Sequence, residues 1–454
     1  MLKPNNIEYY FLSTVPLIYG LLVLPSNETA NIFVTPRLVL LGCVVFIGLL
    51  LRYTGRPRHS VSEFLHGISR QPSYVWWLTL FGFTTVISTM TSVSEGISWF
   101  GTPSNQAGTI FILLSIIVFL LYSTAERVSI FGLVVLIVII NLLVIFEYMG
   151  FRPLNGIVER YLTLTSPFPS VTIGHRGHLA GLLLIFSLMP LYWFRKNYNS
   201  WQFWVIFTLS CTALSCTTNS AAIIAIIASL ILFIIFHLGK LNLYILIIPL
   251  VGLLSLSLYK PLGVANVYFH SIGWVDATAD AKNIRSTTTL ETRFILWKSA
   301  YLLFKERPLL GWGPQTYNQL WYTHISDKDG DRLFRLELGL QPHQKMVRIN
   351  DSAAYKDLDD KTVPVLLNYF APHNSLLDIL YSQGLTGVLI FGIFIISLTR
   401  YLYKCVKASA FLSLLPFIAY GIYLLAWFVT VPVTGLAAIL LGVHVANIKS
   451  GQDV

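Results

Sequence analysis

The sequence has little charge for its length. Only 11% of its 454 residues are Asp, Glu, Lys or Arg, whereas an ordinary soluble domain carries about 25%. Hydrophobic residues make up 55% of the chain, and apolar runs of about 20 residues, long enough to cross the hydrocarbon core of a bilayer, recur from end to end. These features exclude an ordinary soluble fold and indicate that lipid is the solvent.

Cysteine is also scarce, and its placement excludes a disulfide framework. The four cysteines are Cys43, Cys211, Cys216 and Cys405. All of them lie in apolar runs or in a loop that we place in the cytoplasm, so the exposed outer loops have none. Their spacing matches no metal-binding motif, and we expect them to be packing residues.

Acidic residues are outnumbered by basic ones, 21 to 31, which gives a net charge of +10. Such a balance can indicate nucleic-acid binding. In a membrane protein, however, Lys and Arg hold loops on the cytoplasmic side. We therefore expect the bilayer as a partner and no nucleic acid.

The apolar runs predict an all-α, polytopic integral membrane protein of about twelve transmembrane helices. The predicted spans are Tyr9–Leu24, Phe33–Arg52, Val75–Val93, Thr109–Thr124, Val128–Met149, His178–Phe194, Trp201–Thr218, Ala221–His237, Leu241–Tyr259, Leu376–Leu398, Phe411–Val429 and Pro432–Ala446. The first run is followed by Ser26-Asn-Glu-Thr and not by a small-residue cleavage site, so we interpret it as a span and not as a signal peptide.

The loop charges alternate along this map. Loops on one side contain Lys or Arg, including Arg127 and Lys240, whereas the short loops 26–30 and 95–107 on the other side contain neither. This pattern places both termini in the cytoplasm. Three parts follow. Residues 1–260 hold spans one to nine, residues 261–373 form a large periplasmic loop, and residues 374–454 hold spans ten to twelve and a short cytoplasmic tail.

Several arginines lie on the outer side, against the usual bias. They are Arg37, Arg152, Arg160 and Arg176. Cations in such short outer segments suggest an anionic ligand. A set of salt bridges with Glu147, Glu159 and acids of the large loop would explain them as well, and both interpretations stay open.

The large loop is predicted to contain an amphipathic helix. Thr287-Thr-Thr-Leu-Glu291 offers N-cap residues and an acid in the first turn. Apolar residues then recur at spacings of four and three, which predicts one apolar helix face against the membrane surface or the bundle. They are Leu290, Phe294, Trp297, Tyr301 and Phe304. Pro308 should end the helix, and Arg293 either snorkels harmlessly or points into a site.

A histidine stands where the large loop meets the tenth span, in Ala371-Pro-His-Asn-Ser375. Asn374 or Ser375 can cap that helix, whose N-terminus favours a bound phosphate and disfavours a protonated imidazole. A neutral His373 beside a bound phosphate would suit a general base. The alternative is an interfacial histidine without a chemical role.

The same pattern occurs at the outer start of the sixth span, in His175-Arg-Gly-His178. Two histidines three residues apart could bind a metal on a helix, but no third ligand is close in sequence. We therefore expect neither a metal nor another cofactor.

Three segments resemble the bacterial O-antigen ligase and polymerase superfamily. They are Arg293-x3-Trp297 with Pro308-Leu-Leu-Gly-Trp-Gly-Pro314 and Tyr317, then Pro372-His-Asn-Ser-Leu376 with Leu380 and Gly384-Leu-Thr-Gly387, and also Gly174-His-Arg-Gly-His-Leu-Ala-Gly181. The resemblance covers the order of these segments, the twelve-span plan and the position of the long outer loop. Gln383, where many members have an acid, and the doubled histidine around Arg176 depart from the family pattern.

The resemblance implies a GT-C-like, metal-independent, inverting membrane glycosyltransferase. Such enzymes take a glycan from undecaprenyl diphosphate on the periplasmic side and pass it to an acceptor hydroxyl. It implies catalytic roles for His373, Arg293 and Arg176. We expect the substrates to be bound by Arg37, Arg152, Arg160, His175, His178 and Asn374. Our first interpretation is O-antigen ligation to lipid A–core, and the sequence leaves the sugar, the acceptor and the oligomeric state open.

Other functions remain as alternatives. Within the superfamily they are an O-antigen or exopolysaccharide polymerase, whose acceptor is a growing glycan, and a protein O-oligosaccharyltransferase, which the short tail after Ala446 argues against. A transporter of a lipid-linked or anionic solute would need ionisable residues at mid-depth, and the predicted spans hold very few. A membrane scaffold would have no reason to hold Arg176, Arg293 and His373 on one side.

Overall fold

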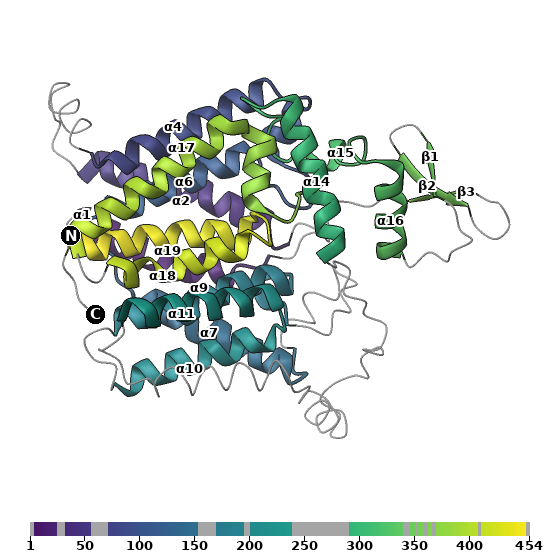
Figure 1. Ribbon diagram of the computed structural model, residues 1–454. Coiled ribbons are helices and arrows are strands. Elements are labelled where there is room, and N and C mark those ends of the chain that lie inside the picture. Colours follow the sequence, from purple (N-terminus) through teal and green to yellow (C-terminus); the bar gives the residue numbers. More distant parts are fainter. Residues whose placement is uncertain are drawn as a thin grey trace.

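The protein is a bundle of roughly parallel helices with a small helical and β-stranded part projecting from one end (Figure 1). The computed structural model describes residues 4–24, 32–55, 71–152, 169–194, 200–237, 290–338, 346–349, 352–356, 362–365, 369–406 and 410–450. Helix α1 begins and α19 ends at one end of the bundle, and α14 to α16 lie at the other.

The described bundle helices each overlap one of the predicted apolar spans. They are α1 (Pro4–Leu21), α2 (Thr35–Gly55), α4 (Ser73–Met90), α6 (Thr109–Ser123), α7 (Phe131–Tyr148), α9 (Arg176–Trp193), α10 (Trp201–Cys216), α11 (Ser220–His237), α17 (Ser375–Val406), α18 (Ala410–Leu424) and α19 (Val431–Lys449). The short α5 (Glu95–Phe100) and the 3₁₀ turn η1 (Val171–Ile173) lie in connections. The predicted span Leu241–Tyr259 lies outside the described residues.

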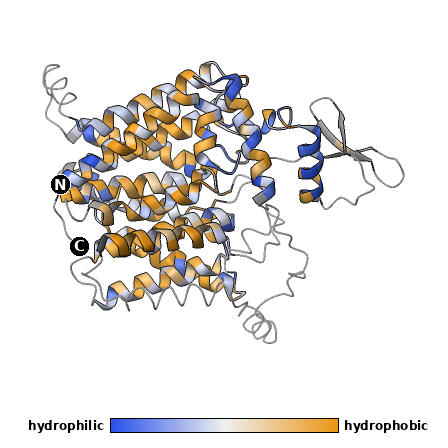
Figure 2. Cartoon of the chain, viewed as in Figure 1, coloured by the Kyte–Doolittle hydropathy of each residue, from blue (hydrophilic) through white to orange (hydrophobic). Residues whose placement is uncertain are grey.

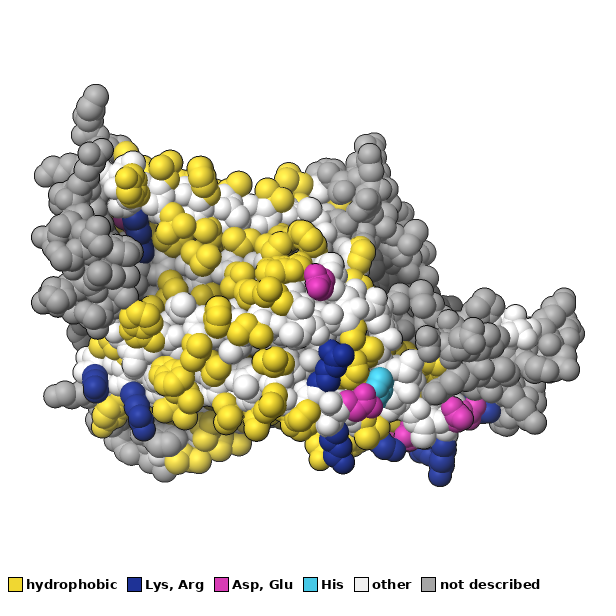
Figure 3. Space-filling model, turned by 90° about the horizontal axis from the view of Figure 1, so that it is seen from above, with side chains coloured by type: hydrophobic (Ala, Val, Ile, Leu, Met, Phe, Trp, Pro, Cys, Tyr) yellow, Lys and Arg dark blue, Asp and Glu magenta, His cyan; other side chains and the backbone are white. Residues whose placement is uncertain are grey.

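The described helices have the composition of a membrane-embedded protein. In α2, α7, α17 and α19 the apolar stretch is long enough to cross a membrane, and α6, α10, α11 and α18 are apolar but shorter. Hydrophobic residues cover these helices (Figure 2), and one face shows them spread along the bundle with charged side chains toward its ends (Figure 3). Large apolar side chains of these helices and of α4, such as Phe46, Phe83, Leu389 and Ile396, are exposed, as expected where lipid replaces water.

The projecting part contains α14 (Leu290–Glu306), α15 (Tyr317–Leu320), α16 (Asp327–Leu338) and three strands. The strands β1 (Met346–Ile349), β2 (Ser352–Lys356) and β3 (Thr362–Val365) form an antiparallel sheet in the order β1-β2-β3. The protein is helical as predicted, but this sheet was not predicted. Its strands are only four or five residues long, and their pairing with one another is a tertiary contact that apolar periodicity does not reveal.

The amphipathic helix forms where it was predicted, but a different face is buried. Phe294 and Tyr301, two members of the predicted apolar face, are 59% and 47% exposed. The buried side instead includes Leu296, Ser299 and Leu303. Ser299 fits there because its hydroxyl donates to the Trp321 carbonyl at 2.9 Å, which satisfies the buried polar group. The side that packs within the protein is therefore not the predicted apolar face, and the placement of that face against the membrane surface stays a prediction.

Helix α17 is broken at Gly384, whose φ of +67° and ψ of −165° are not helical. The segment before the break runs across the end of the bundle, and the segment after it runs along the bundle (Figure 1). A Cβ on Gly384 would lie 2.3 Å from the Leu309 carbonyl oxygen. Only glycine satisfies both the positive φ and this close approach.

The turn after α14 pairs with the broken helix through the backbone. The amides of Trp312 and Gly313 donate to the carbonyls of Tyr381 and Ser382 at 3.0 and 2.9 Å, and the Leu385 amide donates to the Pro308 carbonyl at 2.8 Å. Two of the segments that carry the family resemblance therefore hydrogen-bond to each other. This pairing fixes α14 relative to the start of α17.

Side chains of helix α4 also hydrogen-bond to residues at this break. The Ser88 hydroxyl donates to the Ser382 carbonyl at 2.5 Å, and the Thr85 hydroxyl donates to the side-chain oxygen of Gln383 at 3.1 Å. Gln383, which departs from the family pattern, is 2% exposed. Its neutral amide thus takes part in a buried hydrogen bond, where an ionised acid would place a negative charge.

Arg37 occupies a place different from the expected one. We expected it to bind an anionic substrate, but its side chain is fully buried. Its Nε donates to the Tyr19 carbonyl at 2.9 Å, and its Nη1 donates to the Phe33 carbonyl at 2.6 Å. Its Nη2 donates to the carbonyls of Gly20 and Thr172 at 3.2 and 2.9 Å. The guanidinium therefore faces carbonyl groups and not a ligand, and we leave Arg37 out of the candidate site.

These contacts have a clear electrostatic cause. Tyr19 and Gly20 lie in the last turn of α1, where carbonyl groups lack helical partners and carry partial negative charge. Arg37 caps that turn and, through Thr172, ties it to η1, which directly precedes Gly174-His175-Arg176. Arg37 is therefore a structural cation that anchors the turn preceding His175 and Arg176.

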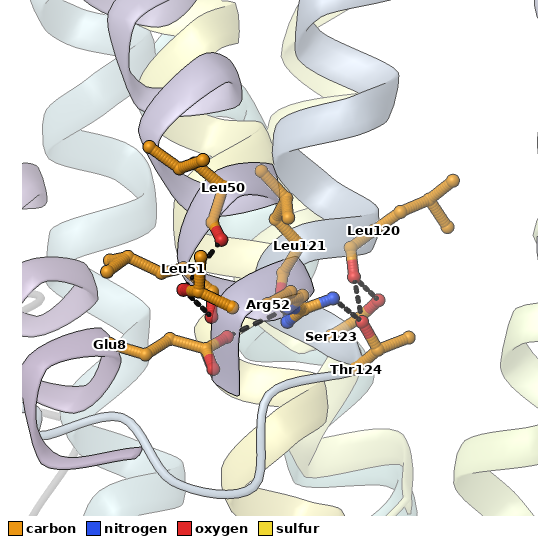
Figure 4. Close-up of polar contacts among 9 residues, drawn as sticks. Glu8, Leu50, Leu51, Arg52, Leu120, Leu121, Ser123 and Thr124 are labelled. Carbon is orange, nitrogen blue, oxygen red and sulfur yellow. Dashed lines mark hydrogen bonds and ion pairs between the residues drawn. The ribbon is translucent and has the colours of Figure 1, made fainter. Parts of the chain in front are cut away.

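A second arginine ties helices together at the opposite end of the bundle (Figure 4). Arg52 donates from Nε to the Glu8 carboxylate at 2.8 Å and from Nη1 to the Thr124 hydroxyl at 2.5 Å. It also donates from Nη2 to the Leu121 carbonyl. Helices α1, α2 and α6 thus meet at this residue.

Replacing Arg37 by Gln should destabilise the protein. The change leaves buried carbonyl groups without donors, so we expect a loss of about 3 kcal/mol in the free energy of unfolding. Unfolding of the purified protein in detergent measures it, with Arg127→Gln as the control, because Arg127 is an exposed arginine at the α6–α7 connection. Equal stability of the two variants would contradict the structural role of Arg37.

Candidate functional site

The three predicted segments meet at the end of the bundle where α14 to α16 lie. His373 directly precedes Asn374, the cap of α17, and Arg176 is the first residue of α9. Arg293 is on α14 and is close enough to His373 to lower its pKa. Tyr423 on α18 lies within electrostatic range of both Arg176 and Arg293. The structure therefore brings together the three residues predicted to be catalytic.

His373 is held in an unusual backbone conformation. Its φ is +54°, in the left-handed region that costs a residue with a side chain roughly 1–2 kcal/mol. The next two residues hold it there. The Asn374 side-chain oxygen accepts from the amides of Leu376 and Leu377 at 3.0 and 3.1 Å, and the Ser375 hydroxyl donates to the Trp427 carbonyl at 3.2 Å. Local strain of this kind is often found at functional residues.

Trp427 lies at the centre of the histidines. It belongs to the connection between α18 and α19 and is 8% exposed. The His175 ring stacks on it with centroids 5.8 Å apart, and the rings of His178 and His373 approach it at 6.0 and 5.6 Å. Phe428 contacts the His373 ring as well, at 5.0 Å. Both predicted histidine segments thus pack on one indole.

The segment before α9 is shaped by its own side chains. His175 is the N-cap of α9, and its Nδ1 accepts from the Gly177 amide at 3.1 Å. An accepting Nδ1 leaves the proton of the neutral ring on Nε2. Glu147 fixes the preceding turn, because its Oε2 accepts from the amides of Ser170 and Val171 at 2.8 and 3.0 Å. Arg176 is therefore presented at the N-terminus of a well-anchored helix.

The electrostatics of the site disfavour positive charge. Burial, and then the nearby Arg293 guanidinium, lower the pKa of His373 from 6.5 to about 4. Burial also lowers the pKa of Arg293 below its ordinary value of 12.5. His373 is thus neutral at physiological pH beside a cationic guanidinium. This arrangement attracts an anion and leaves the imidazole free to accept a proton.

Several buried nitrogen atoms of the site lack protein partners. Among the residues that the structure describes, the Nδ1 of His373, the Nε of Arg293 and the Nε1 atoms of Trp297 and Trp427 are buried without a hydrogen bond. A buried donor without a partner costs about 1–3 kcal/mol. A ligand that supplies acceptor atoms would satisfy the donors among these groups.

The other predicted binding residues have varied positions. Asn374 is at the site, but its side-chain oxygen caps α17. Arg152 follows the C-terminus of α7, within electrostatic range of Glu147. Arg160 lies outside the described residues. Within the described part of the chain, no group of three or more His, Cys, Asp or Glu residues is arranged to hold a metal ion.

Sequence reasoning missed Trp427 and Tyr423. Both fall at the end of a predicted span, where aromatic residues commonly mark the membrane interface. The one local signal is the glycine spacing of α9. A Cβ on Gly177 would lie 2.2 Å from Cζ2 of Trp427, and one on Gly181 would lie 2.8 Å from Cε1 of Tyr423. Two glycines four residues apart form a flat helix face for two large rings.

Comparisons with known proteins agree with the resemblance. A family model described as O-antigen ligase matches residues 204–392, a region that includes Arg293, His373 and the break in α17. The match agrees with the resemblance of these segments to the O-antigen ligase and polymerase superfamily. An uncharacterized protein of Haemophilus influenzae is 26% identical over 169 residues, which are 36% of this chain and 42% of the relative. The aligned region is thus less than half of the relative's length.

Gly177→Ala should disturb the packing of the indole. The new methyl group would overlap Trp427, so we expect a loss of about 1–3 kcal/mol in the free energy of unfolding. Gly42→Ala is the matched control, because a Cβ at that helical position meets nothing within 4 Å. Unfolding in detergent measures both variants. A Gly177→Ala protein as stable as the control would show that the indole does not pack against α9 as described.

Proposed function

We propose that the protein transfers a glycan from undecaprenyl diphosphate to an acceptor hydroxyl at the outer face of a bacterial inner membrane. The reaction would be metal-independent and inverting, and O-antigen ligation to lipid A–core is the first choice. The observation that carries the proposal is the meeting of Arg176, Arg293 and neutral His373 at one end of an apolar helix bundle. The large loop would be periplasmic and both termini cytoplasmic, in a bundle of about twelve spans.

The arginines suit a diphosphate leaving group. As the glycosidic bond breaks, negative charge develops on the lipid diphosphate. Guanidinium groups stay charged and offer paired hydrogen bonds to phosphate oxygens. Arg176 also stands at the N-terminus of α9, where the helix dipole favours an anion. Donors that are already in place when the charge develops stabilise it without reorganisation.

His373 suits the role of general base. A neutral imidazole would accept the proton of the acceptor hydroxyl while the hydroxyl oxygen attacks the anomeric carbon. A bound diphosphate would offset the positive field of Arg293 and raise the pKa of His373 toward its ordinary value. The base would therefore become stronger when the donor is bound. A single displacement of this kind inverts the anomeric configuration.

Product analysis after reconstitution tests the proposal. The purified protein is mixed with undecaprenyl-diphosphate oligosaccharide and lipid A–core. Glycan on lipid A–core establishes a ligase, and a ladder on the carrier lipid establishes a polymerase. If neither product forms with several donors, the transfer proposal fails, and transport of a lipid-linked solute is the next function to assay.

Substitutions at the site should abolish transfer without unfolding the protein. We expect His373→Ala to lower kcat by about 10²- to 10⁴-fold and Arg293→Lys or Arg176→Lys to lower it by about 10²-fold or more. The matched control is Arg332→Lys, because Arg332 lies on α16 and forms an exposed ion pair with Glu291. A fully active His373→Ala protein would rule out the general base.

The pH dependence should separate the free enzyme from its donor complex. A neutral His373 is lost as the pH falls, so the rate should fall on the acid side. In the free enzyme the pKa is about 4, and kcat/KM for the donor should begin to fall near that pH. The acid limb of kcat should lie at higher pH, because the bound diphosphate raises the pKa. Two results would contradict this account. One is a fall of kcat at the same acid pH as the fall of kcat/KM, and the other is an acid-side fall that persists in His373→Gln.

A further inference from the structure

The indole of Trp427 has features that packing alone does not explain. Its ring lies nearly parallel to those of His175, Tyr423 and Phe428, with interplanar angles of 27°, 26° and 14°. Stacking therefore accounts for the burial of the ring faces. It does not account for the ring edge that carries Nε1.

The Nε1–H of Trp427 is a buried donor without an acceptor among the described residues. Trp312 shows the usual outcome elsewhere in the protein, since its Nε1 donates to the Leu303 carbonyl at 2.7 Å. Buried indole N–H groups normally have such a partner. The N–H of Trp427 departs from this rule, on a residue that is only 8% exposed.

The ring edge that carries Nε1 lies close to the N-terminus of α9. A Cβ on Gly177, in the first turn of α9, would lie 2.2, 2.5 and 2.9 Å from Cζ2, Cη2 and Cε2 of Trp427, and Cε2 is the ring atom bonded to Nε1. The N–H is therefore beside the helix N-terminus that carries Arg176. On α14, the Nε of Arg293 and the Nε1 of Trp297 are buried donors without described partners as well, four residues apart on one helix face.

We propose that Trp427 is a substrate-binding residue whose indole N–H donates a hydrogen bond to an oxygen of the lipid-linked donor, beside the oxygens bound by the arginines. This inference rests on the proposed function, because it assigns a further contact in the same site. The unpartnered N–H groups of Trp427, Arg293 and Trp297 would be satisfied by a ligand that brings acceptors. A lipid diphosphate carries them.

The test separates the N–H from the shape of the ring. Trp427 is replaced by Phe and, site-specifically, by 3-benzothienylalanine, which keeps the bicyclic shape and has sulfur in place of the N–H. Binding of undecaprenyl diphosphate to the purified protein in detergent is measured together with KM for the glycan donor. Trp201→Phe is the matched control, because Trp201 is 70% exposed at the start of α10.

We expect both Trp427 variants to bind the lipid diphosphate about tenfold more weakly, the size of one lost hydrogen bond, while Trp201→Phe binds as the wild type does. Wild-type affinity and KM in the benzothienylalanine protein would overturn the proposal and leave Trp427 a packing residue. If the wild type itself neither binds the lipid nor transfers a glycan, the proposed function fails and this contact with it. If the wild type does both, only the contact is in question.

Discussion

The backbone pairing between the broken α17 and the turn after α14 is the constraint on which the site depends. Two short segments more than 60 residues apart, around Gly311 and Gly384, are joined by hydrogen bonds between backbone amides and carbonyls. The break frees backbone groups of α17, and the turn satisfies them, as an apolar surrounding requires. The same bonds fix α14, with Arg293, against the segment that begins at His373. Helices α14 and α17 thereby form one support for the site.

The other half of the site is built on α9 and depends on small residues. Gly177 and Gly181 allow Trp427 and Tyr423 to lie against the helix, and the Tyr423 hydroxyl donates to the Gly177 carbonyl at 2.5 Å. Arg37 and Glu147, both buried, hold the turn that leads into His175 and Arg176. Their charges are satisfied by backbone groups, so they stabilise the support and do not compete with the arginines for an anion.

Much of this arrangement could be predicted from the sequence, because lipid imposes simple rules. The apolar runs gave the positions of the described bundle helices, and the order of the family-like segments indicated Arg176, Arg293 and His373. Three features could not be predicted, because each depends on contacts distant in sequence. Arg37 caps α1 from α2, α14 buries Ser299 and exposes Phe294, and Trp427 packs against Gly177. In each case the polarity of the residue alone predicted one position, and a contact with a residue distant in sequence determined the observed one.

The most direct test of the central claim is a structure of the protein in lipid nanodiscs with undecaprenyl diphosphate, determined by electron cryo-microscopy. The account predicts density for the two phosphates between Arg176 and Arg293, within reach of His373. Density for the phosphates at another place, such as the opposite end of the bundle near Arg52, would contradict it.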